Sequence, residues 1–523
     1  MTKRGSAGRV VLALGWGVLV VALWMGLTVG VAPAQADPGS GDSTTQSAKD
    51  SDKPSLRRDK PARLGPRKEK VRRVDDIATR ARTALTGALD RRPTLRTAQS
   101  LPRPKLSTKR LMPEIRKAID VAAEKPLITG AVDRIATPGR TLIADRTDKV
   151  PTAAIRTRAT GQDSAPLVNI VGSLVFNVVG AALQVFSGPP ALPPGSTVTV
   201  RTSTLDMPGT DQTVRADWYF PEDPDSATGV IYLQHGFMAT GPMYSYTAAY
   251  LAESTNSIVV VPTLSSNLFD TDGEWIGGEP MQQSVADLFA EDRSELTASA
   301  SAAAGHPVTL PAKFVLVGHS LGGMLVTGAA GRMVENGAVD DLAGIVLLDA
   351  VDTHNDMPDA LDQLSGANYR PVLLISSERY VWNRNGTVGD ELQAARPGQF
   401  NGVMLVGGRH IDGMTGGNPI LQFAEYFIAG FSQPQNTEAV KTISAGWIND
   451  MFNGTDDGIH GEPQQSIDIP TSAGTATAVV LPFTSADPVQ ATPWDGLVGP
   501  LLDALFRYAV YEPLAGQSVA IAV

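Results

Sequence analysis

Short apolar runs alternate with amphipathic stretches along the central part of this 523-residue chain. Most runs are uniformly apolar and end in glycine or polar residues, which is typical of strands buried on both faces of a parallel sheet. They occupy residues 229–233, 257–262, 314–317, 344–348, 371–375 and 402–406. Two earlier runs, 197–204 and 213–219, alternate between apolar and polar residues, as antiparallel strands often do. Because strands alternate with helices, the pattern predicts an α/β fold with a mostly parallel, doubly wound sheet and flanking helices.

The stretches between the strands have helical periodicity. Helices are predicted at residues 243–254, 281–304, 324–334 and 419–428. The 281–304 stretch is expected to be one uninterrupted helix. With the strands, these helices define a central domain over residues 196–432. Beyond it, an amphipathic helix (437–452), a β-like run (475–482) and an apolar helix (497–508) predict a C-terminal extension, residues 433–523, that packs on this domain.

An uncharged segment, residues 167–188, precedes the central domain. On a helix, its polar residues fall on one side and its valines and leucines largely face elsewhere. The polar side consists of Asn169, Ser173, Asn177, Gln184 and Ser187. A helix that crosses a bilayer does not need such a stripe, so residues 164–195 are predicted to form an amphipathic helix and a linker. The helix either docks on the central domain, which we favour, or lies at a membrane surface.

The N-terminus has the three parts of an export signal. Lys3, Arg4 and Arg9 are basic, residues 10–31 are uncharged and mostly apolar, and Ala34-Gln35-Ala36 fits a cleavage site. We therefore expect a signal peptide over residues 1–36 and a secreted or cell-envelope protein. The apolar run is also long enough to span a bilayer, so an uncleaved membrane anchor is the alternative. The sequence contains no cysteine, which excludes disulfides, thiolate metal sites and a cysteine nucleophile.

Residues 37–163 carry 29 lysines and arginines against 16 acidic residues, whereas the whole chain has a net charge of −10. The segment is rich in proline, serine and threonine, so it is predicted to be a basic, low-complexity arm that is largely disordered. Short helices are expected in it only at 74–89 and 112–123. Candidate partners of the arm are the acidic remainder of the chain, a membrane surface or an anionic envelope polymer, and the alternative is a solvated linker. Nucleic acid is not expected as a partner of an exported protein.

The candidate chemistry lies where the strand at 314–317 meets the helix at 324–334. The residues between them include Gly318-His319-Ser320-Leu321-Gly322, a G-x-S-x-G sequence in the strand–turn–helix setting that a nucleophile elbow requires. The turn projects the Ser320 hydroxyl above the sheet, and the two glycines let strand and helix approach closely. Ser320 is therefore the predicted nucleophile.

An activated serine needs a base, and a histidine base needs an acid that orients it. Of the six histidines, only His410 directly follows a late strand downstream of the serine, so it is the predicted base. The acid is less clearly defined by the pattern. Asp349 ends the strand at 344–348 and is favoured, while Asp352 and Glu378 remain alternatives.

Two backbone N–H groups must stabilise the developing oxyanion. Leu321 is expected to supply one, and Phe237, or else Met238, the other, from the loop after the strand at 229–233. The segment between residues 349 and 371 is too short for a large cap domain. The site is therefore expected to be open unless the 167–188 helix or the C-terminal extension covers it. No cofactor and no metal are expected, because the sequence has neither a correctly placed nucleotide-binding turn nor a complete calcium loop.

At these residues the chain resembles the α/β-hydrolase superfamily, over about residues 229–430. The specific motifs are HGF at 235–237, GHSLG at 318–322 and GGRHID at 407–412. The chain is similar to secreted actinobacterial lipase/esterase and chlorophyllase-like branches, whose acid lies in an Asp-Pro-Val-Asp-Gly stretch. Residues 349–353 match that stretch except at Ala350 and Thr353, so the resemblance favours Asp349 as the acid.

The resemblance implies an exported serine hydrolase that cleaves carboxylic esters, including lipids, through a Ser-His-Asp triad and an acyl-enzyme. Two alternatives use the same fold. One is an acyltransferase with the same triad, and the other is a non-catalytic envelope-binding protein on a hydrolase scaffold.

We predict that the exported protein begins at Asp37, because the small residues before it fit a signal-peptidase site. Mass spectrometry of the N-terminal peptide of the exported protein tests this expectation. Recovery of a membrane-bound chain that retains residues 1–36 would instead support the uncleaved anchor.

Overall fold

The computed structural model describes residues 167–514. The chain divides into two units, residues 1–36 with 159–523 and residues 37–158, and all described residues belong to the first unit. The predicted signal peptide, the basic arm and its two short helices lie outside the described residues.

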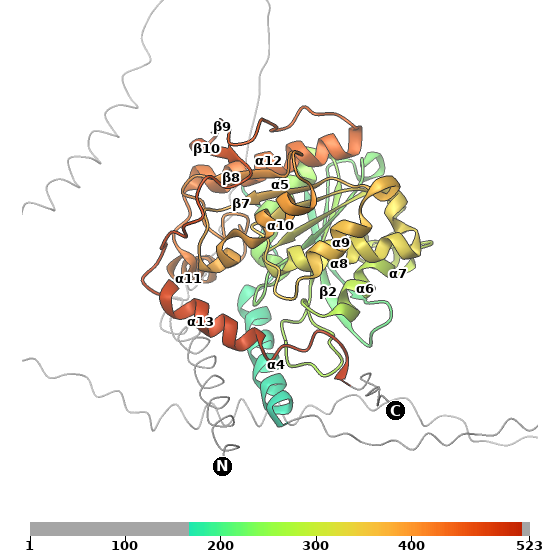
Figure 1. Cartoon of the computed structure of the whole chain (residues 1–523). Coiled ribbons are helices and arrows are strands. Elements are labelled where there is room, and N and C mark those ends of the chain that lie inside the picture. Colours follow the sequence, from blue (N-terminus) through green and yellow to red (C-terminus); the bar gives the residue numbers. More distant parts are fainter. Residues whose placement is uncertain (1–166, 515–523) are drawn as a thin grey trace, which may run out of the picture. The chain divides into compact units, whose positions relative to one another are not determined.

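A ten-stranded sheet forms the centre of the described unit, in the order β1-β2-β4-β3-β5-β6-β7-β8-β10-β9 (Figure 1). The six strands from β4 to β8 in this order are parallel, and the two strands at each end are antiparallel. The strands are β1 (Thr199–Asp206), β2 (Thr213–Phe220), β3 (Val230–Gln234), β4 (Ile258–Thr263), β5 (Phe314–His319), β6 (Leu342–Leu348), β7 (Val372–Ser376), β8 (Gly402–Leu405), β9 (Ser466–Thr471) and β10 (Gly474–Val480). The predicted α/β fold with a mostly parallel sheet is confirmed.

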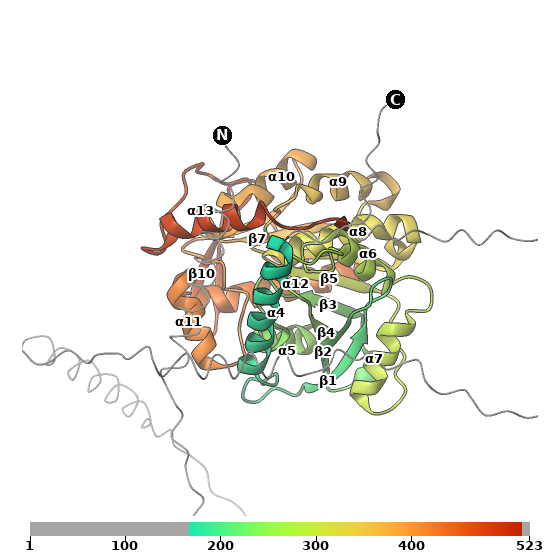
Figure 2. The same cartoon turned by 90° about the horizontal axis from the view of Figure 1, so that it is seen from below.

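Helices cover both faces of the sheet (Figures 1 and 2). One face packs against α6 (Glu279–Asp287), α7 (Ser294–Ala304), α8 (Leu321–Asn336), α9 (Asp356–Gln363) and α10 (Thr387–Ala395). The other packs against α5 (Ser245–Thr255), α11 (Pro419–Ala429) and α12 (Pro434–Asn453). In β5, Phe314 and Leu316 contribute to the first core, and Val315 and Val317 to the second. Successive side chains of a strand point to opposite faces, which explains why the central strands are apolar throughout.

The prediction of one helix over residues 281–304 is wrong. α6 ends at Asp287 and α7 begins at Ser294, and Glu291 and Arg293 between them have positive φ angles. The break lets Phe289 stack on Phe314 at 4.0 Å between ring centroids, and the Arg293 guanidinium lies over the same ring. Arg293 also pairs with Asp341 at 2.8 Å. These tertiary contacts outweigh the helical propensity of the segment.

Two helices lie at the carboxyl end of the parallel strands, α4 (Leu167–Ser187) and α13 (Asp495–Phe506) (Figures 1 and 2). The chain reaches α13 after α12 and the β9–β10 hairpin, which extends the sheet beyond β8. The strand β9 is absent from the predicted elements, which contain only the β-like run at 475–482 in this region; β9 is short, and only Ile469 among its residues is buried. The fold therefore brings the two ends of the described segment to the edge of the sheet where Ser320 lies.

Candidate active site

Ser320 occupies the sharp turn between β5 and α8. Its φ of 54° is unusual for a residue other than glycine and costs on the order of 1–3 kcal/mol. Hydrogen bonds hold the turn: the Ser320 N–H donates to Leu348 O at 3.1 Å, and Ser320 O accepts from the Val351 N–H at 3.0 Å. A side chain at Gly318 or Gly322 would collide with neighbouring backbone atoms, so both positions require glycine.

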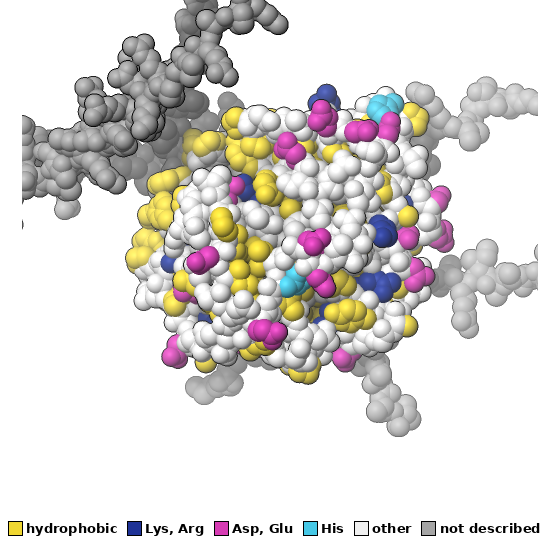
Figure 3. Space-filling view, turned by 90° about the horizontal axis from the view of Figure 1, so that it is seen from above, with side chains coloured by type: hydrophobic (Ala, Val, Ile, Leu, Met, Phe, Trp, Pro, Cys, Tyr) yellow, Lys and Arg dark blue, Asp and Glu magenta, His cyan; other side chains and the backbone are white. Residues whose placement is uncertain are grey.

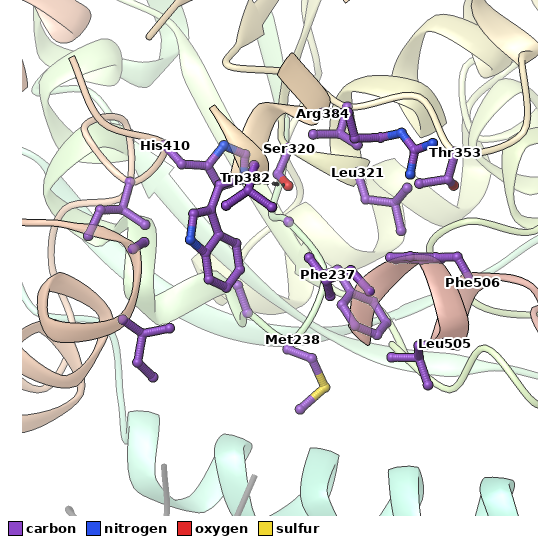
Figure 4. A pocket seen from close by; sticks show the side chains of 18 of the residues that line it. Phe237, Met238, Ser320, Leu321, Thr353, Trp382, Arg384, His410, Leu505 and Phe506 are labelled. Carbon is purple, nitrogen blue, oxygen red and sulfur yellow. Dashed lines mark hydrogen bonds between the residues drawn. The ribbon is translucent and has the colours of Figure 1, made fainter. Parts of the chain in front are cut away.

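His410 lies in the loop after β8 and forms hydrogen bonds on both sides of its ring. Figure 4 shows its side chain beside that of Ser320. Its Nε2 is 2.8 Å from Ser320 Oγ, and its Nδ1 is 2.6 Å from Asp349 Oδ2. Because a carboxylate can only accept, Nδ1 carries the proton and Nε2 is free to accept the serine hydroxyl proton. The backbone N–H of His410 donates to the Tyr380 hydroxyl, which fixes the loop. The indole of Trp382 lies alongside the His410 ring.

Asp349 is buried and surrounded by hydrogen-bond donors. Its Oδ1 accepts from the Ser377 N–H at 2.8 Å and from Ser376 and Asn383 at 3.1 Å each, and its Oδ2 accepts from Ser377 Oγ at 2.9 Å. Burial alone would raise the pKa of Asp349, but the bond and charge of His410 and these donors outweigh burial and lower it below its ordinary value. The carboxylate therefore stays charged and orients the imidazole.

The two alternative acids lie elsewhere. Asp352 accepts backbone N–H groups of His354, Asn355 and Met357 and so caps the start of α9. The Glu378 carboxylate is 3.8 Å from the Arg409 guanidinium. Of the three candidate acids, only Asp349 forms a hydrogen bond with the His410 side chain.

The loop expected to hold the oxyanion lies directly against the nucleophile. Gly236 is so close to Ser320 that an added side chain would meet the Ser320 Cβ at 2.8 Å. The Met238 N–H donates to Ser266 Oγ at 2.8 Å, which removes it from the candidate donors. Among residues 167–514, the N–H groups of Phe237 and Leu321 have no hydrogen-bond partner. Both are therefore free to bind an oxyanion formed beside Ser320.

A second hydrogen-bonded chain ties the oxyanion loop, the elbow and the histidine together. The Gly236 N–H donates to the Tyr244 hydroxyl at 3.0 Å, and that hydroxyl donates to His319 Nδ1 at 2.6 Å. The Nε2–H of His319 then donates to the His410 carbonyl at 2.7 Å. Burial and the neighbouring His410 lower the pKa of His319 to about 3, so this histidine stays neutral. Its role is to position the loops around Ser320.

The hydroxyl of Ser320 faces a cavity of about 590 Å³. Most of the cavity is apolar, and its walls include Val175, Phe176, Val179 and Leu183 of α4 and Leu501, Leu502, Leu505 and Phe506 of α13. Arg384 and Thr353 form a polar end, on the opposite side of Ser320 from His410 (Figure 4). α4 and α13 are thus the segments that cover the site. Residues 167–514 contain no cluster of three His, Cys, Asp or Glu side chains able to hold a metal ion.

Glu425 of α11 also lines the cavity, and it is almost completely buried. Its Oε2 accepts a hydrogen bond from the Gln422 side chain at 3.3 Å. Burial raises the pKa of Glu425 to about 8, so the carboxyl is mostly protonated at neutral pH.

Several residues that hold the site are not signalled by the sequence pattern. Ser376 is the last residue of β7 and Ser377 follows it, so both obey the same strand-end rule that located Asp349 and could have been found. Asn383 lies in the irregular η5 segment (Val381–Gly386), and Tyr380 directly precedes it. No hydrophobic periodicity identifies either residue.

A family model described as the alpha/beta hydrolase family matches residues 230–507. A search of curated protein sequences returned no match to the chain.

Solved structures similar to the chain include three esterases. A thermostable esterase from Pseudomonas putida has 15% sequence identity, with 54% of this chain and 92% of that chain covered and a TM-score of 0.36. Brefeldin A esterase, described as a bacterial homologue of human hormone sensitive lipase, has 14% identity, coverage of 56% and 88%, and a TM-score of 0.37. An esterase from the archaeon Pyrobaculum calidifontis has 15% identity, coverage of 56% and 94%, and a TM-score of 0.35. These distant similarities do not identify a substrate.

The acid can be tested with paired variants. Asp349→Asn is expected to lower kcat for a nitrophenyl ester by roughly 10³–10⁴-fold, because an amide no longer stabilises the correct tautomer or the imidazolium. Asp352→Asn is the matched control and should keep kcat within a few-fold. Because the amide nitrogen cannot accept a hydrogen bond, the loss of the bonds made by one oxygen should cost about 0.5–1.5 kcal/mol of stability. The reverse pattern of kcat values would make Asp352 the acid.

Glu425 gives a prediction about pH and stability. Its folded-state pKa of about 8 lies above the ordinary 4.5, so its contribution to stability is full below pH 4.5 and is lost as pH rises through 8. Glu425→Gln removes this ionisation. The melting temperature of the variant minus that of the parent protein should therefore increase as the pH rises between these two values. Thermal melts across that range test this, and a constant difference between the two proteins would contradict it.

Proposed function

The chain belongs to the alpha/beta hydrolase family, and from this premise we propose that it is a serine hydrolase that cleaves carboxylic esters. One observation carries the proposal: Ser320 Oγ lies 2.8 Å from His410 Nε2, and His410 Nδ1 lies 2.6 Å from the Asp349 carboxylate. A serine, a histidine base and a buried acid in this order are the machinery of acyl transfer.

In the first half-reaction, His410 Nε2 takes the Ser320 hydroxyl proton while Oγ attacks the ester carbonyl carbon. The carbonyl oxygen becomes an oxyanion, which the N–H groups of Phe237 and Leu321 stabilise. The bond to the alkoxy oxygen then breaks, and this oxygen leaves as an alcohol after accepting the proton from His410. The acyl group remains on Ser320.

In the second half-reaction, His410 takes a proton from a water molecule, and the resulting hydroxide attacks the acyl carbonyl. Collapse of the second tetrahedral intermediate breaks the bond to Ser320 and releases a carboxylic acid, and the proton returns to Oγ. Throughout, the charged Asp349 stabilises the imidazolium that forms on His410. If an alcohol took the place of water, the same steps would give an acyltransferase.

The cavity supports an ester with an extended apolar part. Its volume of about 590 Å³ lies within the range of small-molecule sites, and its walls on α4 and α13 are apolar. We propose that an acyl chain or lipid-like alcohol occupies this part of the cavity. Export to the cell envelope or medium is also proposed, supported by the basic, apolar and small-residue pattern of residues 1–36.

Ser320→Ala tests the function directly. The variant should lose turnover of a short-chain nitrophenyl ester by roughly 10⁴-fold or more, because no other nucleophile is activated. Its melting temperature should stay within a few degrees of the parent, since alanine fits the same turn. Full turnover by the folded variant would remove Ser320 from the mechanism.

A further inference from the structure

The helix α4 turns its polar side towards the protein. Asn169 and Ser173 donate hydrogen bonds to the Phe269 carbonyl at 3.3 and 3.0 Å, and Gly172 sits against the Phe269 ring. The predicted polar stripe is thus largely the docking side of the helix, although Asn177 and Gln184 are exposed.

The outer side of α4 is apolar and exposed. Leu174 is 65% exposed and Val185 is 79% exposed, and the helix contains no charged residue. An ordinary surface helix exposes mainly polar and charged side chains, whereas α4 also leaves a row of large apolar side chains exposed. The exposed apolar side chains of α4 would be more stable in contact with an apolar environment than in water.

The exposed apolar surface continues onto α11. Asn418, at the start of α11, donates to the Phe186 carbonyl near the end of α4 at 3.2 Å. Phe423 of α11 is 61% exposed, and Phe427 contacts Trp494 at the start of α13 with ring centroids 5.8 Å apart. We call the exposed apolar side chains of α4 and α11, together with Trp494 and Leu497, the apolar rim.

The apolar rim lies on one face of the molecule. Figure 2 shows α4, α11 and α13 side by side on the face seen from below. On the opposite face, charged side chains of both signs are scattered among polar ones, and hydrophobic side chains gather towards one edge (Figure 3). The only charged residue of α11 is Glu425, which is buried. A lipid surface could therefore meet α4 and α11 without desolvating an exposed charge of either helix.

We propose that the apolar rim docks on a lipid surface and that the cavity takes its ester from that surface. The rim and the cavity share α4, whose outer side carries Leu174 and whose inner side carries Phe176 and Val179. An apolar molecule can thus pass from the surface to Ser320 along one helix. The hydrogen bonds of Asn169 and Ser173 hold α4 on the domain, so it lies on the bilayer instead of crossing it.

The charge of the chain supports an anionic lipid surface as the occupant of the apolar rim. The basic segment 37–163, with 29 lysines and arginines, precedes α4 directly and complements an anionic lipid surface. Docking on lipid does not depend on catalysis at Ser320, whereas the identity of the substrate as an ester rests on the proposed function.

Vesicle flotation with the Ser320→Ala protein tests docking separately from catalysis. The full-length chain is expressed, and its exported form is mixed with vesicles of phosphatidylcholine and phosphatidylglycerol. The rim variant adds Leu174→Gln and Phe423→Gln, and the control adds Tyr369→Gln and Val406→Gln at exposed residues that belong to none of α4, α11 and α13. The rim variant should bind roughly tenfold more weakly or worse, and the control should bind like the parent. Circular dichroism verifies that all three proteins are folded.

Three outcomes would overturn the proposal: no binding by the parent, equal binding by the rim variant, or binding that high salt abolishes, which would assign it to the basic segment. A parent dimer that the rim substitutions dissociate, without vesicle binding, would make a second copy the occupant. If the wild-type protein lacks esterase activity while the Ser320→Ala protein binds vesicles through the rim, the proposed function fails and the docking surface stands.

Discussion

The hydrogen bond between Ser320 Oγ and His410 Nε2 is the interaction on which the rest of the site depends. It joins two loops that are 90 residues apart in sequence, and it exists only because both follow parallel strands at the same edge of the sheet. Ser320 and Asp349 both have positive φ angles, so the sheet holds two strained residues in place. The stability of the core thus supports a geometry that an isolated loop would not adopt.

The strand pattern was sufficient to predict the parallel sheet, and the position of Ser320 at a strand–turn–helix junction followed from it. His410 could be predicted for the same reason. The pattern and the resemblance favoured Asp349 as the acid but left Asp352 and Glu378 open, because all three follow strands at one edge and only side-chain contacts separate them. The break before α7 was equally hidden, since it depends on contacts of Phe289 and Arg293 with Phe314 that local propensity does not contain.

The two helices that cover the cavity explain features of the sequence that the core does not need. A segment with no charge and a narrow polar stripe is a poor core helix, but it suits a position between a polar loop and an apolar environment. α4 satisfies the Phe269 carbonyl with its polar side and leaves leucine and valine outside. The same helix lines the cavity together with α13, so the proposed docking surface and the substrate cavity share one helix.

The central claim is that the bond to His410 makes Ser320 uniquely nucleophilic. Its most direct test is mass spectrometry of the protein after reaction with a fluorophosphonate, which traps an activated serine as a stable covalent adduct. The account predicts one adduct, on the peptide that contains Ser320, and none when His410 is replaced by glutamine. An adduct on another residue, or no adduct on a folded protein, would contradict it.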